Sequence, residues 1–275
     1  MNDSPKECTP DEVISAIEAY RKFVAEDARK SLELLIREGE EQELGPGWKN
    51  EDEAKITEAL LSSCEQYLCA EDGLPSFNSP RELLSRYDEV VDRYALDGVV
   101  WHRRDGSQGA KMRAEGHIEI LDQALRDSVS TPASIPFEVA IPQEYKTLMR
   151  HVDSLHGVGL PIHRRSPSFW EGCIEREDVI KGRVLASERI KALNSSWLPG
   201  YDIATGWQTG KSDDGFIFVI LCRNEETGEL WQWRYTRVEW SVPECKVWDD
   251  VPSFLEYYAH HLPSNASAWF IPLDE

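Results

Sequence analysis

The sequence predicts an α+β fold, in which a mainly helical N-terminal region precedes an antiparallel or mixed sheet flanked by helices. Capping signals and apolar residues at steps of three and four recur up to Asp127, as expected for helices. The apolar run Phe216–Cys222 is followed by a polar turn and by the alternating segment Leu230–Tyr235, which is typical of a hairpin. Of the ten tryptophans, eight lie beyond Thr131, where these strand signals begin.

The first helix is expected to begin at Thr9. Thr9, Pro10 and Glu12 supply an N-cap hydroxyl, a proline at the first helical position and the glutamate of a capping box. The apolar residues that follow form one stripe: Val13, Ile17, Tyr20, Val24, Ala28, Leu32 and Leu35. Gly39 and the sequence Gly45-Pro46-Gly47 are expected to end the helix.

Further helices and one short strand are expected in the same region. Asn50 and Glu53 open a second helical pattern, and Ser79-Pro80-Arg81-Glu82 repeats the first capping pattern for a third. The run Val99-Val100-Trp101 predicts a short strand, and Arg113–Asp127 returns to helical spacing. The apolar stripes of these helices need a partner surface, so we expect the helices to pack on the sheet.

Two parts of the chain are distinguished by composition, a helical region over residues 1–130 and a sheet-containing domain over 131–275. In the second part, Phe216–Cys222 has the continuous apolar character of a strand covered on both faces. It is expected to pair antiparallel with Leu230–Tyr235, because the turn between them is short and polar. A last helix is expected near Asp250, with the apolar stripe Val251, Phe254, Leu255, Tyr258 and Leu262.

A family resemblance covers about residues 131–263. Ile141-Pro142-Gln143-Glu144-Tyr145 opens a helix that ends near Leu155-His156-Gly157, and the glycine-containing segment Thr209–Gly215 reads as a turn before the apolar strand. Ser253–Tyr258 has the form Ser-Phe-Leu-x-aromatic-aromatic in the closing helix. In this order the motifs resemble the SMI1/KNR4 (SUKH) family, and its fungal members more than its bacterial ones. Gln143 and His156 depart from the acidic residue and the asparagine that are frequent in the family.

The resemblance implies a binding module and not an enzyme. Members of the family have a sheet flanked by helices, and they act as immunity proteins in bacteria or as intracellular regulators in fungi. We therefore predict a non-enzymatic protein-binding module that serves as a regulator, a scaffold or an immunity-like inhibitor. No cofactor or metal is expected, and the partner and the oligomeric state are left open.

The charge favours a protein partner over a nucleic acid or a membrane. The chain carries 30 Lys and Arg against 50 Asp and Glu, a formal net charge of −20, with the acidic excess in both parts. Such a surface repels phosphate backbones and anionic headgroups, whereas it attracts a basic protein. No secretory signal or membrane-spanning apolar run is found, so we expect the cytoplasm, with the nucleus as the alternative.

The candidate contact residues are aromatic. Tryptophan and tyrosine are enriched at binding hot spots, and they also fill cores. The candidates are Trp207, Trp231, Trp233, Tyr235 and Trp240. If the polar face of Gln232 and Arg234 is the open one, these aromatics belong to the core. The site itself is expected on a concave surface beside the sheet.

Two rival functions remain open. One is a hydrolase that uses Cys173 or an acidic group such as Glu175, Glu177 and Asp178, or Asp213 and Asp214. The other is an adaptor that binds through its helical region. Strongly shifted carboxylate pKa values in one deep pocket would favour the enzyme, and an acidic, aromatic-lined groove would favour the binding module.

Overall fold

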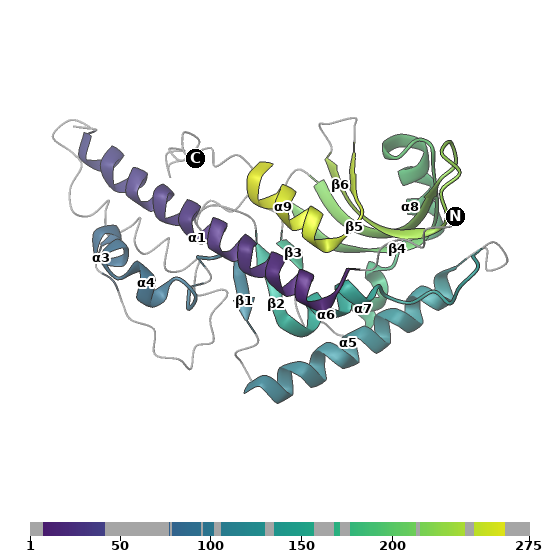
Figure 1. The fold of residues 1–275 in the computed structure, drawn as a ribbon, viewed down its shortest axis with the longest axis horizontal. Coiled ribbons are helices and arrows are strands. Elements are labelled where there is room, and N and C mark those ends of the chain that lie inside the picture. Colours follow the sequence, from purple (N-terminus) through teal and green to yellow (C-terminus); the bar gives the residue numbers. More distant parts are fainter. Residues whose placement is uncertain are drawn as a thin grey trace.

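The fold consists of an antiparallel sheet accompanied by helices (Figure 1). The computed structural model describes residues 8–41, 77, 79–94, 96–101, 106–129, 135–156, 168–170, 177–212, 215–239 and 245–261. The α+β class predicted from the sequence is confirmed. The predicted helix after Asn50, and Trp240, lie outside these residues.

The sheet has seven strands in chain order, and each strand pairs antiparallel with the next. The strands are β1 (Val99–Trp101), β2 (Val152–His156), β3 (Ser168–Trp170), β4 (Tyr201–Ser212), β5 (Gly215–Asn224), β6 (Gln232–Glu239) and β7 (Lys246–Trp248). The predicted strand Val99–Trp101 is confirmed, and its pairing with β2 joins the first part of the chain to the sheet. The expectation of a turn over Thr209–Gly215 is wrong for Thr209–Ser212, because these residues extend β4 and pair with β5.

The predicted β5–β6 hairpin is confirmed, with Val219 opposite Tyr235. The Asn224 side chain stabilises the turn, since its Oδ1 accepts the backbone N–H groups of Glu226 at 2.9 Å and Thr227 at 3.2 Å. Gly228 closes the turn with a φ of 69°, a conformation that favours glycine. The second strand begins only at Gln232, so Leu230 and Trp231 precede it.

Both faces of β5 are covered, as its apolar run predicts. Ile217, Val219 and Leu221 alternate into the main core, which α1, α5, α6 and α9 also line. Phe218, Ile220 and Cys222 point to the other face, where a second cluster contains Leu185, Ile190, Leu193 and Leu198. This cluster is formed by α8 (Ser187–Ala192) and the π-helix Leu193–Trp197 with its flanking residues.

The first helix, α1 (Pro10–Glu41), follows its predicted start. Thr9 and Glu12 form the capping box: the Thr9 N–H donates to Glu12 Oε2 at 2.8 Å, and the Glu12 N–H donates to Thr9 Oγ1 at 3.3 Å. The stripe from Val13 to Leu32 is buried. The helix continues two residues beyond Gly39, so this glycine does not end it.

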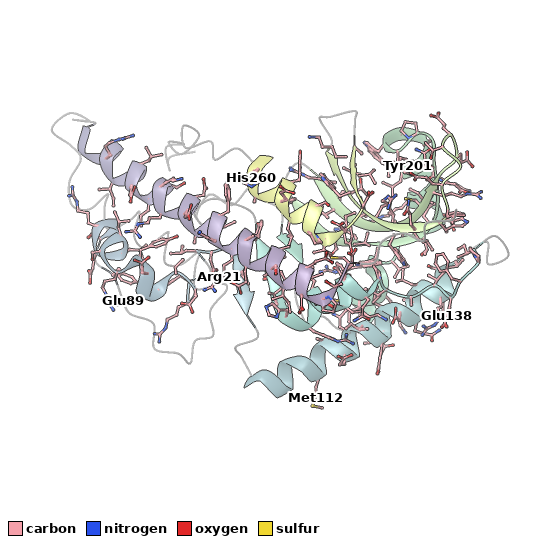
Figure 2. The ribbon with its side chains drawn as sticks, in the orientation of Figure 1. Arg21, Glu89, Met112, Glu138, Tyr201 and His260 are labelled. Carbon is pink, nitrogen blue, oxygen red and sulfur yellow. The ribbon has the colours of Figure 1, made fainter. Side chains whose placement is uncertain are left out.

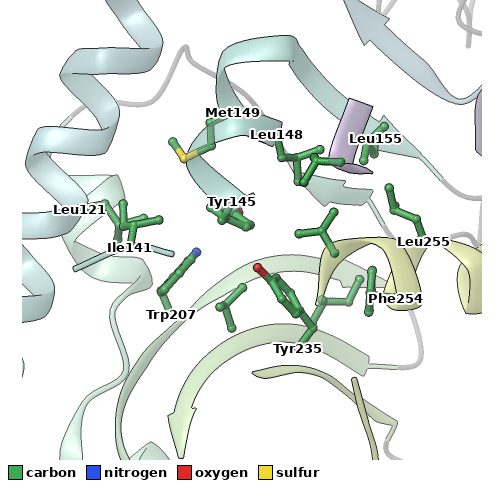
Figure 3. Close-up of a cluster of buried hydrophobic side chains, with 14 of the residues drawn as sticks. Leu121, Ile141, Tyr145, Leu148, Met149, Leu155, Trp207, Tyr235, Phe254 and Leu255 are labelled. Atoms are coloured by element: carbon green, nitrogen blue, oxygen red, sulfur yellow. The ribbon is translucent and has the colours of Figure 1, made fainter. Parts of the chain in front are cut away.

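The helices of the first part pack on the sheet-containing part, as their apolar stripes require. The N-terminal half of α1 lies against α6 (Gln143–His151) and α9 (Val251–His261), and α5 (Gly106–Ser128) lies against α6 and α7 (Glu177–Arg183). Figure 3 shows this shared core, in which Leu121 of α5, Tyr145 of α6, Tyr235 of β6 and Phe254 of α9 meet.

The C-terminal half of α1 covers a smaller cluster. Two short helices, α3 (Pro80–Ser85) and α4 (Tyr87–Val90), pack there, and Arg86 separates them. The predicted cap is present, because Ser79 Oγ accepts the Glu82 N–H at 3.2 Å. Arg21 of α1 donates to buried Asp97 at 2.6 Å, which ties the middle of α1 to the start of β1.

Candidate functional site

A groove with a volume of about 1190 Å³ lies where α1, the segment 136–144, the start of β6 and α9 meet. Figure 2 shows two of its lining residues, Glu138 after α5 and His260 at the end of α9, at well-separated positions along the molecule. The groove is therefore lined both by the segment after α5 and by the end of α9.

Helix starts place two carboxylates at this groove. Glu12 lies in the capping box of α1, and Asp250 caps α9 by accepting the Ser253 N–H at 2.7 Å. The first turn of a helix leaves N–H groups unpaired and carries partial positive charge, so acidic side chains are stable there. The capping sequences thus determine where these charges lie.

The position of a third carboxylate, that of Glu144, depends on Asp122 of α5, which holds the start of the helix that carries Glu144. Asp122 accepts the Ile141 N–H at 2.5 Å and the Lys146 ammonium at 2.9 Å. These bonds hold the turn at Pro142, from which α6 starts, and therefore the position of Glu144 in its first turn.

The Glu144 side chain is buried at the inner side of the groove. Its Oε1 accepts the Tyr235 hydroxyl proton at 2.6 Å, and its carboxylate also accepts the Val251 N–H. Burial raises the pKa of Glu144 to about 7, because the charged form loses hydration, and the nearby charge of Asp250 adds to this rise. Glu144 is therefore partly protonated near neutral pH.

The Cys8 thiol shares this environment. Burial and the neighbouring carboxylates, Glu144 first among them, raise its pKa to about 12. A thiol with such a pKa stays protonated at neutral pH, and it is the thiolate that attacks substrates. Cys8 is therefore a poor nucleophile.

Six carboxylates line the groove: Glu12, Glu138, Glu144, Asp249, Asp250 and Glu256. Its lining also contains one arginine, Arg234, which pairs with Asp249 at 3.1 Å and with Glu229 at 3.7 Å. The lining therefore contains more acidic than basic side chains.

Apolar side chains are exposed at the same place. Four large hydrophobic side chains are exposed in the described part of the chain, and two of them, Phe137 at 44% and Leu230 at 58%, line the groove. The other two, Met112 and Val179, lie elsewhere. Exposed apolar residues gathered beside acidic side chains are typical of an interaction surface.

The predicted aromatic residues divide between the core and the groove. Trp207 and Tyr235 are buried in the core (Figure 3). There the rings of Trp207 and Tyr145 pack edge to face, with 5.0 Å between their centroids. Trp207 and Tyr235 cannot contact a partner in this conformation, since β4 and β6 point them between the sheet and α6. Trp231 is largely buried and Trp233 is half-buried, and both line the groove.

Residues that the sequence did not single out complete the site. Glu144 was identified only as part of the family motif, Leu230 as a strand residue and Asp250 as a helix start, and Phe137 was not singled out. An open polar face with Arg234 was one of two possibilities from the sequence; Arg234 is 9% exposed and pairs with Asp249 and Glu229.

Of the residues of the hydrolase hypothesis, the structure describes Glu177 and Asp178, which lie on α7 and do not line the groove. Cys173, Glu175 and the Asp213–Asp214 pair lie outside the described residues. Glu177 pairs with Lys181 at 2.6 Å on the surface of α7. In the described ranges, no three His, Cys, Asp or Glu side chains are gathered as metal ligands are.

The fold and the groove define the class of molecule, an α+β protein with an acidic, partly aromatic groove between its helical and sheet parts. Comparison with models of known protein families, with curated proteins and with solved structures finds no match. None of the helices described here has the length and apolar character needed to cross a membrane.

Proposed function

We propose that this chain is a non-enzymatic protein-binding module of the SMI1/KNR4 type, which holds a basic, partly apolar segment of a partner protein in the groove. The observation that carries the proposal is the coincidence of two features. Among the described residues, four large hydrophobic side chains are exposed, and two of them lie in the groove that contains six carboxylates. Apolar contacts supply affinity, and the charges favour a cationic partner.

The electrostatics also speak against nucleic acid as the ligand. A net charge of −20 and an acidic groove repel phosphates, so binding energy from counterion release is lacking. A basic protein is instead attracted to the groove. Its association rate should fall as salt is added, because the Debye screening length is only about 10 Å at 0.1 M ionic strength.

The test is selection of peptides from a phage-displayed library of random sequences on the full chain. We expect enriched peptides that combine Lys or Arg with apolar residues. Their affinity should fall at least tenfold with the double variant Phe137→Ser and Leu230→Ser, because both exposed anchors are lost. The matched control is Met112→Ser with Val179→Ser, which removes exposed apolar side chains outside the groove and should leave the affinity unchanged.

Two results would refute the proposal. If selection yields only peptides that bind both double variants alike, the groove is not the site. Selected peptides without any excess of Lys and Arg, bound equally at low and high salt, would show that the charge plays no part.

A second candidate function, a hydrolase, is favoured by one observation. The raised pKa of Glu144, about 7, suits a general acid in a groove. The protonated Cys8 thiol argues against a nucleophile beside it. Turnover of an ester, peptide or glycoside substrate that disappears with Glu144→Gln would establish this alternative. If none of these substrates is turned over, the binding module is the function that remains.

A further inference from the structure

The first half of β6 has an open edge. On one side, β5 pairs with β6 along its whole length, from Gln232 to Glu239. On the other side, β7 pairs only with Tyr235–Arg237. In the described part of the chain, Gln232–Arg234 therefore have no strand beside them on the β7 side.

This open edge forms a wall of the groove. Leu230–Arg234 line it, together with Asp249 and Asp250, which follow β7. The chain turns at these two residues into α9, so β7 stops where the groove begins. An unpaired edge presents backbone N–H and C=O groups in a row, and exposed apolar residues next to it favour pairing with another strand.

We propose that the partner segment binds in an extended conformation and adds a strand to β6 beside Gln232–Arg234, continuing the line of β7. The inference rests on the proposed function, because it concerns the same groove. Backbone hydrogen bonds to the edge supply affinity that is independent of sequence.

Side chains of the added strand alternate between the two faces of the sheet. Those on one face point to the side of Trp233 and Tyr235, where Tyr235 contacts Glu144. A lysine or arginine at such a position meets the groove carboxylates, and an apolar residue meets the exposed ring of Phe137 or the side chain of Leu230. The segment is therefore expected to combine basic and apolar residues.

The charge of the groove fits a segment of a partner protein better than residues 1–7 or 262–275 of this chain. Residues 262–275 contain Asp274 and Glu275 and no Lys or Arg, and residues 1–7 contain one lysine against two acids. Neither end offers the excess of positive charge that the groove favours, so a basic segment of another protein is the better occupant.

The experiment uses the peptides selected on the full chain. Each is synthesised with a single N-methyl group at successive backbone positions, which removes one N–H donor and keeps every side chain. We expect losses of tenfold or more at alternate positions, and near-unchanged affinity at those between, because only every second N–H faces β6. Aminoisobutyrate at two positions, which favours a helix, should weaken binding.

Other outcomes separate the inference from the proposed function. N-methylation tolerated throughout overturns strand addition. Tighter binding with aminoisobutyrate also overturns it and shows that the groove takes a helix. Displacement of the selected peptides by a synthetic 262–275 peptide at similar affinity overturns the assignment to a basic partner. If no peptide depends on Phe137 and Leu230, the proposed function itself fails, and the inference with it.

Discussion

The raised pKa of Glu144 contributes a loss of folding stability as pH rises, and Glu144→Gln should remove this contribution. In the folded chain the pKa is about 7, against an ordinary value of 4.5. The protonated form is thus favoured by folding, so the stabilising contribution is complete below pH 4.5 and is lost as pH rises through 7. Glutamine keeps the shape and cannot ionise.

The size of the effect follows from the two pKa values. Each change of one in pKa corresponds to about 1.4 kcal/mol, which gives about 3 kcal/mol in total and about 2.5 kcal/mol of it between pH 5 and pH 8. The glutamine amide also replaces one oxygen acceptor, at a cost that does not depend on pH. The quantity to compare is therefore the change in unfolding free energy between pH 5 and pH 8, in which this cost cancels.

The assay is urea unfolding followed by tryptophan fluorescence at several pH values and constant ionic strength. Relative to the wild type, Glu144→Gln should lose about 2.5 kcal/mol less stability between pH 5 and pH 8. Tyr235→Phe should act in the opposite direction, since the hydroxyl bond at 2.6 Å favours the ionised carboxylate. Parallel pH dependences for the wild type and Glu144→Gln would refute the account of Glu144.

Three further predictions concern the fold. Gly206→Ala should destabilise the chain by about 2 kcal/mol or more, measured as a lower Tm, because an added Cβ would lie 2.4 Å from the Val219 carbonyl oxygen of the paired strand; an unchanged Tm would contradict the tight β4–β5 approach. His117 is buried, and desolvation lowers its pKa to about 4, so stability should be lost as pH falls from 6.5 to 4 by about 3 kcal/mol, and His117→Gln should abolish this acid loss in urea unfolding. Trp207→Ala should cost about 3 to 5 kcal/mol in the same assay, whereas a loss below about 1 kcal/mol would show that Trp207 is not a core residue.

Local signals in the sequence specified the elements and their ends. The capping boxes at Thr9 and Ser79, the apolar run of β5 and the Asn224–Gly228 turn each depend on neighbours within a few residues, and each has the structure that was predicted. The two-sided burial of β5 also follows from its composition alone. These local signals could not determine which helices and strands pack against one another in the folded chain.

The groove and the protonation of Glu144 were decided by tertiary structure. Glu144 is separated by 91 residues from Tyr235, its hydrogen-bond partner, and by 22 residues from Asp122, whose bonds to Ile141 and Lys146 position its helix. Trp207, Tyr235 and Trp231 became buried residues of the main core, while Trp233 is half-buried, and Trp231 and Trp233 also line the groove. A pKa and an exposed area depend on the whole three-dimensional surroundings of a side chain, whereas helix and turn propensities act through the adjacent chain.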